Sequence, residues 1–79
     1  MRFEFELNWT VPRTQFKTLL LTALKFADLH RLDCVSIERN TDKDPHTFQV
    51  FTSKNPIYCE PRPTITEAYK AAEARIIGS

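Results

Sequence analysis

Residues 3–9 read Phe-Glu-Phe-Glu-Leu-Asn-Trp, an alternation of apolar and polar side chains with a period of two. Because successive side chains of a strand point to opposite faces, this period predicts a half-buried β-strand. The buried face would consist of Phe3, Phe5, Leu7 and Trp9. The other face, which is acidic and wet, would consist of Glu4, Glu6 and Asn8. The other elements have to cover the apolar face of this strand, so the alternation limits the possible folds.

The size and charge of the chain exclude several classes of protein. Its 79 residues suit one domain, so we expect 1–79 to fold as a single unit. Eleven Lys and Arg against ten Asp and Glu leave a net charge of +1, which gives no general attraction to nucleic acid or an anionic membrane. A single glycine excludes a glycine-rich phosphate loop. No apolar run reaches the ~18 residues of a membrane span, and no apolar leader precedes the first strand, so we expect a cytoplasmic protein.

A long helix is predicted from Pro12, which suits the first turn of a helix, to about Leu32. Apolar residues recur there with the i, i+3, i+4, i+7 spacing of one helical face. That face consists of Phe16, Leu19, Leu20, Ala23, Leu24 and Ala27. Leu21 and Leu29 fall on the far side, either as ordinary exposed leucines or as a strip for self-association.

Two more strands are predicted, at 34–40 and 47–53, on either side of the turn-forming run 40–45. Their inward side chains would be Val35, Ile37, Phe48 and Val50. Their outward side chains would be Ser36, Glu38, Gln49 and Phe51. A short edge segment is expected at 57–59, where Pro61 and Pro63 limit its length.

The last element carries the clearest local signal. Thr64 and Glu67 have the spacing of a capping box, in which each side chain bonds the other residue's backbone amide. The buried stripe of the helix that follows would consist of Ile65, Ala68, Tyr69, Ala72 and Ile76. Gly78 ends the helix.

These elements predict an α+β fold with the order β-α-β-β-α. The long crossover helix makes the first two strands parallel, and the tight turn makes the third antiparallel to the second. The simplest arrangement is a two-layer sandwich. Its three-stranded, mostly antiparallel sheet would have the strand order 1-3-2, with both helices on the apolar face. The opposite face of the sheet would stay open to solvent.

Few residues in this sequence suit catalysis or metal binding. His30, His46, Cys34 and Cys59 are the available nucleophiles, bases or zinc ligands, and none has the spacing of a catalytic or zinc motif. The lack of a secretory leader favours reduced cysteines over a disulfide between Cys34 and Cys59. We therefore expect no enzyme activity, no metal and no cofactor.

The open sheet face is the candidate binding surface. Its carboxylates Glu4, Glu6 and Glu38 repel phosphate and would suit a host protein with a basic surface, with Phe51 as an apolar anchor. The alternative interpretation is that these are ordinary solvent-side strand residues.

Two other surfaces lead to different hypotheses. Lys54 and Arg62 lie near the proline-rich segment and form a second candidate patch. They support the alternative function of a small RNA- or DNA-binding module. A homodimer could instead form through Leu21 and Leu29, or through an unpaired edge strand.

The aromatic-rich first strand and the closing Pro-Thr-Ile-Thr-Glu-Ala-Tyr-Lys-Ala-Ala-Glu-Ala-Arg segment resemble small phage-encoded accessory proteins, a group that includes anti-CRISPR proteins. The resemblance is one of size and architecture, so it transfers no functional residue. It implies a non-enzymatic inhibitor, encoded by a phage or mobile element. Such a protein would occupy a surface of a host defence complex such as CRISPR-Cas, in the host cytoplasm.

Overall fold

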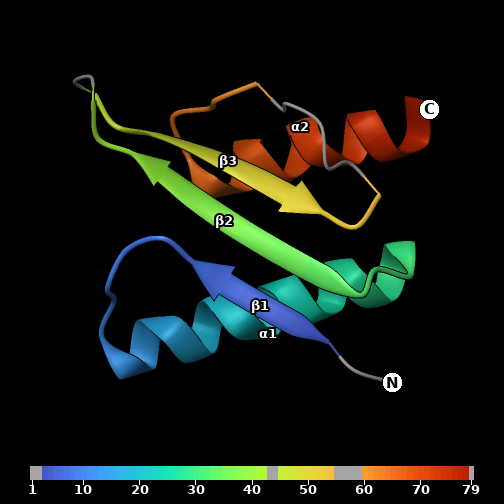
Figure 1. The fold of residues 1–79 in the computed structure, drawn as a ribbon, viewed down its shortest axis with the longest axis horizontal. Coiled ribbons are helices and arrows are strands. Elements are labelled where there is room, and N and C mark those ends of the chain that lie inside the picture. The colour runs from blue at the N-terminus through green and yellow to red at the C-terminus, as the bar shows by residue number, and fades with distance from the viewer. Residues whose placement is uncertain (1–2, 43–44, 55–59, 79) are drawn as a thin grey trace.

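The computed structural model describes residues 3–42, 45–54 and 60–78. Its elements are β1 (Glu4–Leu7), α1 (Arg13–His30), β2 (Cys34–Asn40), β3 (Thr47–Thr52) and α2 (Ile65–Gly78). Figure 1 shows them in order from the N-terminus in blue to the C-terminus in red. The predicted order β-α-β-β-α is confirmed. The edge segment predicted at 57–59 lies outside the described residues.

The strand order in the sheet is β1-β2-β3, so the predicted order 1-3-2 is wrong. β1 pairs directly with β2 in parallel, and the Glu4 amide donates to the Asp33 carbonyl at 2.9 Å. β3 pairs antiparallel with the other edge of β2. The sheet is therefore mixed, with one parallel and one antiparallel pair, rather than mostly antiparallel.

The outer edge of β3 explains why this strand is not central. There Phe48 and Arg62 exchange both backbone hydrogen bonds, at 2.7 and 2.9 Å, so the chain itself occupies part of the edge that β1 would have needed. β2 is paired along both edges, and its inward Val35 and Ile37 are 1% and 0% exposed. Strands joined by one crossover helix usually lie side by side, which is the arrangement seen here for β1 and β2.

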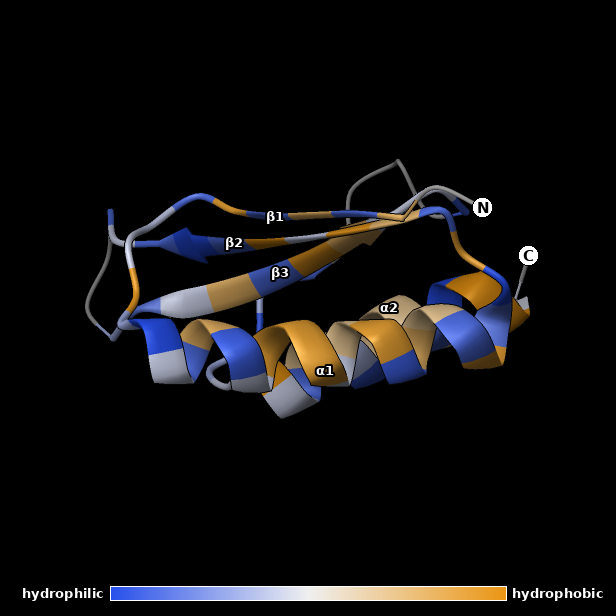
Figure 2. Cartoon of the chain, turned by 90° about the horizontal axis from the view of Figure 1, so that it is seen from below, coloured by the Kyte–Doolittle hydropathy of each residue, from blue (hydrophilic) through white to orange (hydrophobic). Residues whose placement is uncertain are grey.

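Both helices lie on the same side of the sheet in Figure 2. The buried cluster between them and the strands consists of Ala23, Ala27, Leu32, Val35, Ile37, Val50, Ala68, Tyr69 and Ala72. Alanines of both helices are in this cluster, and their small side chains let the helix backbones approach the strands closely. The inward directions predicted for Val35, Ile37 and Val50 are confirmed.

The two helices run in the same direction. The rings of Phe26 and Tyr69 lie 4.9 Å apart, and one turn further along both helices His30 Nε2 lies 2.8 Å from Glu73 Oε2. Since both contacts advance by one turn on each helix, α1 and α2 are parallel.

The ends of the two helices can be compared with the ends predicted from the sequence. The Glu67 amide donates to Thr64 Oγ1 at 3.1 Å, which is the forward half of the predicted capping box. α1 ends at His30 rather than near Leu32, because Arg31 adopts a left-handed conformation with φ 56° and ψ 55°. The Leu32 amide then bonds back to the Ala27 carbonyl at 2.8 Å.

Candidate binding surface

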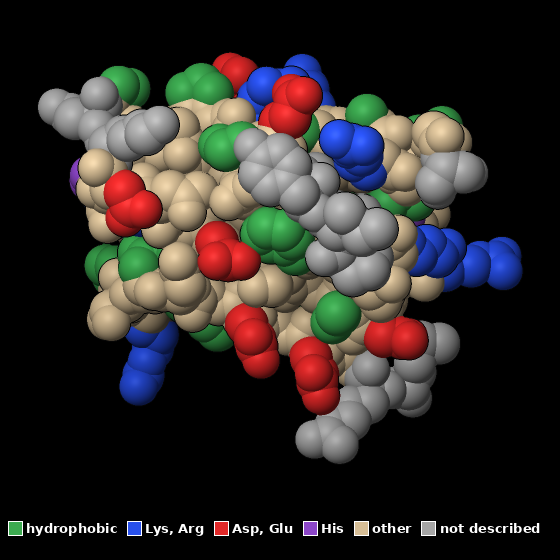
Figure 3. Space-filling view, turned by 45° about the horizontal axis from the view of Figure 1, so that its top comes forward, with side chains coloured by type: hydrophobic (Ala, Val, Ile, Leu, Met, Phe, Trp, Pro, Cys, Tyr) green, Lys and Arg blue, Asp and Glu red, His purple; other side chains and the backbone are tan. Residues whose placement is uncertain are grey.

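The sheet brings together the four residues predicted to bind a partner through its outer face. Glu6, Ser36 and Phe51 stand in one row across the three strands. Glu4 precedes Glu6 on the same face of β1 and lies opposite Cys34. Glu38 lies in the next outward row, opposite Gln49. Because alternate residues of a strand share a face, Glu4, Glu6, Glu38 and Phe51 form one surface, which we call the acidic face. Figure 3 shows acidic side chains in a row across this side of the molecule.

The acidic face is not uniformly wet. Glu4 and Glu6 are exposed, whereas Glu38 and Phe51 are half-buried. Gln49 was expected to contact water but is only 9% exposed, and its Oε1 accepts a hydrogen bond from Asn40 Nδ2 at 2.9 Å. The most accessible carboxylates of the acidic face therefore belong to β1.

The carboxylates of β1 also affect the thiol of Cys34, which lies beside them on β2. Burial raises the pKa of Cys34, and the negative charges of Glu4, Asp33 and Glu6 raise it further. Asp33 was not singled out in the sequence. Its position directly before the second strand, next to Cys34, was the signal that could have identified it. Cys34 is a free thiol, and Cys59 lies outside the described residues.

Lys54 and Arg62, the residues of the second candidate patch, have separate contacts. Lys54 Nζ donates to the His30 carbonyl at 2.7 Å, where a cation complements the carboxyl end of α1. Arg62 Nη2 lies 2.7 Å from Glu60 Oε2. Lys54 follows the end of β3 whereas Arg62 bonds Phe48 near its start, and a strand of this length spans roughly 17 Å. Each cation therefore has its own contact at its own end of the strand.

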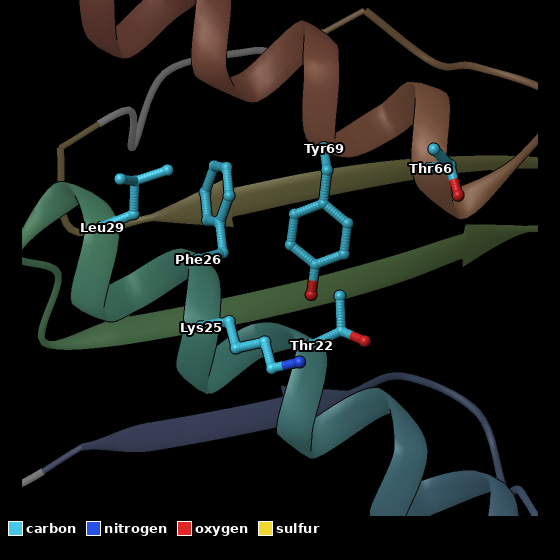
Figure 4. Close-up of a pocket in the computed structure, with 6 residues that line it drawn as sticks. All are labelled: Thr22, Lys25, Phe26, Leu29, Thr66 and Tyr69. Carbon is cyan, nitrogen blue, oxygen red and sulfur yellow. The ribbon is translucent and has the colours of Figure 1, made fainter.

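On the helix side, Leu21 and Leu29 are 50% and 71% exposed. Figure 4 shows a groove between α1 and α2, of about 280 Å³. It is lined by Thr22, Lys25, Phe26, Leu29, Thr66 and Tyr69. The Tyr69 hydroxyl has no hydrogen-bond partner among the described residues, and burial raises the pKa of Tyr69 to about 12. That oxygen is closed off from the surface, so a molecule in the groove would not reach it.

The described histidines have partners that suit structural roles. His30 bonds Glu73, and Arg39 Nη2 donates to His46 Nδ1 at 2.8 Å. Within residues 3–42, 45–54 and 60–78, no group of three or more His, Cys, Asp or Glu side chains is placed to hold a metal ion. In the same part of the chain, no helix has both the length and the apolar composition to cross a membrane.

A scan against protein-family models gives no match, and comparisons with curated proteins and with solved structures give none either.

Proposed function

We propose that this chain is a non-enzymatic protein-binding inhibitor that covers a basic surface of a host protein complex with its acidic face. In this proposal the helices form one layer behind the sheet, and the outer sheet face is left for the partner. The protein would be encoded by a phage or mobile element, as its resemblance to anti-CRISPR proteins suggests. It would act in the host cytoplasm on a defence complex such as CRISPR-Cas.

The observation that carries the proposal is the common face of Glu4, Glu6, Glu38 and Phe51. Glu6 and Glu38 form no ion pair within the described residues, so their charges are available to a partner. A surface that binds nucleic acid is rich in Lys and Arg, and a row of carboxylates complements it. Phe51 adds an apolar contact at the β3 end of the row, beside Ser36, and aromatic side chains often anchor protein interfaces.

The alternative hypothesis, a nucleic-acid-binding module, requires free cations on a shared surface. Lys54 and Arg62 have separate contacts at opposite ends of β3, and the acidic face repels phosphate. These contacts favour a protein partner over a nucleic acid.

The test is a pull-down from host lysate with tagged protein, with and without nuclease treatment. Its variants are Glu4→Lys with Glu6→Lys, and a control with the same charge change at exposed positions elsewhere, Asp28→Lys with Asp42→Lys. We expect wild type and control to retain a stoichiometric protein after nuclease treatment, and the acidic-face variant to lose it. Circular dichroism and urea unfolding would establish that all three are folded.

Equal capture by the two variants would remove the acidic face from the interface. Nucleic acid in the untreated eluate, with no protein left after nuclease, would instead favour the alternative hypothesis. Binding through phosphate contacts would also weaken steeply with added salt.

A further inference from the structure

β1 is an edge strand whose outer side pairs with no described segment of the chain. The Glu4 amide bonds the Asp33 carbonyl, and the backbone groups of alternate residues in a strand point the same way. The amides and carbonyls of Phe5 and Leu7 therefore point away from the sheet. Such an edge is a template for one more strand, supplied by another polypeptide.

The helix beneath this edge offers apolar surface to the same incoming strand. The Phe5 and Phe16 rings lie 5.6 Å apart, which places the start of α1 beside β1, and Figure 1 shows β1 crossing in front of this helix. Phe16, Leu20 and Leu24 follow one another along one ridge of α1, because residues four apart on a helix are neighbours. Phe16 and Leu24 are each 40% exposed. Inward side chains of an added strand would cover this ridge.

A hollow of about 430 Å³ opens where β1 ends. It is lined by Leu7, Trp9, Thr10, Val11, Arg13 and Phe16. The hollow continues the apolar ridge to the carboxyl end of β1, so it would accept an apolar side chain at one end of the added strand.

The charge of β1 decides what kind of strand can be added. On the outer face a neighbouring strand would stand beside Glu4 and Glu6, both exposed. Two copies of β1 paired antiparallel would place these carboxylates opposite their counterparts, and like charges directly opposite destabilise a strand pair. Lys or Arg at the same positions would form favourable cross-strand pairs. The edge therefore disfavours a second copy of this chain and favours a basic partner.

We propose that β1 accepts an extended segment of the partner protein as a fourth strand, in which Lys or Arg on the outer face alternate with apolar residues facing α1. This inference rests on the proposed function, because the acidic face supplies its charge complementarity. It adds the mode of binding, which is backbone pairing along β1, and a sequence pattern for the bound segment.

The test uses a fluorescent peptide, Lys-Val-Lys-Val-Lys-Val with blocked ends, and measures its anisotropy at low ionic strength. Two analogues carry N-methyl groups, one on every Lys and the other on every Val. In an extended peptide the Lys amides point to one edge and the Val amides to the other. Strand addition predicts that one analogue binds about tenfold or more weakly while the other is little changed, since each lost backbone bond contributes roughly 1 kcal/mol.

Protein variants test the same geometry. Leu24→Ser should weaken peptide binding, because Leu24 lies on the ridge beside β1. The matched control Leu21→Ser should not, although Leu21 is the more accessible of the two, at 50% exposure against 40%. The variant Glu4→Lys with Glu6→Lys should lose the Lys peptide and gain affinity for Glu-Val-Glu-Val-Glu-Val.

The outcomes separate this inference from the proposed function. If acidic-face variants abolish partner capture but both N-methyl analogues bind alike, the protein binds by its acidic face and strand addition is wrong. Failure of the wild-type protein to bind the Lys peptide would also overturn strand addition. Strand addition would also be overturned if sedimentation showed that the protein forms a stable dimer at micromolar concentration and that this dimer does not bind the peptide. If Glu4→Lys with Glu6→Lys leaves partner capture unchanged, the proposed function itself is wrong.

Discussion

The carboxamide of Asn8 pairs with the backbone of Arg39 as another strand residue would. Its Oδ1 accepts from the Arg39 amide at 2.7 Å, and its Nδ2 donates to the Arg39 carbonyl at 3.2 Å. β1 has only four residues, so these two bonds extend its pairing with β2 beyond Leu7. A short strand is thereby held in register at the end where the chain turns towards α1.

We expect Asn8→Ala to lower the free energy of unfolding by about 1–2 kcal/mol, because two hydrogen bonds are lost. Asn8→Asp should cost less, since it keeps the acceptor for the Arg39 amide. Urea unfolding measures both, with the exposed Thr10→Ala as a control. Equal stability of wild type and Asn8→Ala would show that the side chain adds nothing to the pairing.

Arg31→Gly should stabilise the protein by about 0.5–1 kcal/mol. Arg31 holds φ at 56°, in the left-handed region that disfavours a residue with a Cβ atom and favours glycine at the end of a helix. Its side chain is exposed, so its removal should cost little. Thermal unfolding tests this, and a lower melting temperature for Arg31→Gly would contradict it.

Tyr69→Phe should raise stability by about 1 kcal/mol, because a buried hydroxyl that has no partner among the described residues costs free energy that phenylalanine avoids. Tyr69→Ala should instead cost about 3–5 kcal/mol, through loss of the buried ring and its contact with Phe26. Chemical unfolding distinguishes the two effects. A loss of stability in Tyr69→Phe would mean that the hydroxyl has a partner in solution.

The same residue predicts a decline of stability in alkali. Burial raises the pKa of Tyr69 to about 12 in the folded protein, whereas an unfolded tyrosine ionises near pH 10. The contribution is therefore complete below about pH 10 and is lost as the pH rises towards 12, with a total of about 2–3 kcal/mol. Unfolding measured across this range should show the decline in wild type and a smaller one in Tyr69→Phe. Parallel curves would show that Tyr69 does not cause it.

Cys34 can report the potential of the acidic face. Burial and the charges of Glu4, Asp33 and Glu6 raise its pKa, so little of the reactive thiolate is present near neutral pH. In a Cys59→Ser background, we expect Glu4→Gln with Glu6→Gln to speed alkylation of Cys34 by iodoacetamide at about pH 8. Glu38→Gln, a carboxylate that does not act on Cys34, should leave the rate unchanged. Equal rates in all variants would mean that burial alone sets the reactivity.

The type and order of the elements could be predicted from sequence, because each has its own period or cap. The alternation at 3–9 specifies a strand and its inward side chains, and the spacing from Phe16 to Ala27 specifies a helix. The Thr64 cap specifies where the second helix begins. All three are local signals, which depend only on residues close together in the chain.

The neighbours of each strand could not be predicted in this way. Alternation states which face a side chain occupies, but it does not state which strand lies alongside. The order depended on Arg62, whose backbone bonds Phe48 from a distant part of the sequence. The contacts of the two cations could not be predicted from composition either. Lys54 bonds the carbonyl of His30, which is distant in sequence, and Arg62 pairs with its near neighbour Glu60. The acidic face survived the change of order, because every order of these strands keeps its residues on one side.

The bond between Phe48 and Arg62 also governs how this sheet can grow. One margin of the sheet is bridged there by the chain itself, while among the described residues β1 has no neighbour at the other margin. The margin across the sheet from a strand added at β1 differs from it, because the backbone of Phe48 is already bonded to Arg62 there. Edge pairing would then terminate after one addition, yielding a closed complex of fixed stoichiometry instead of a fibre.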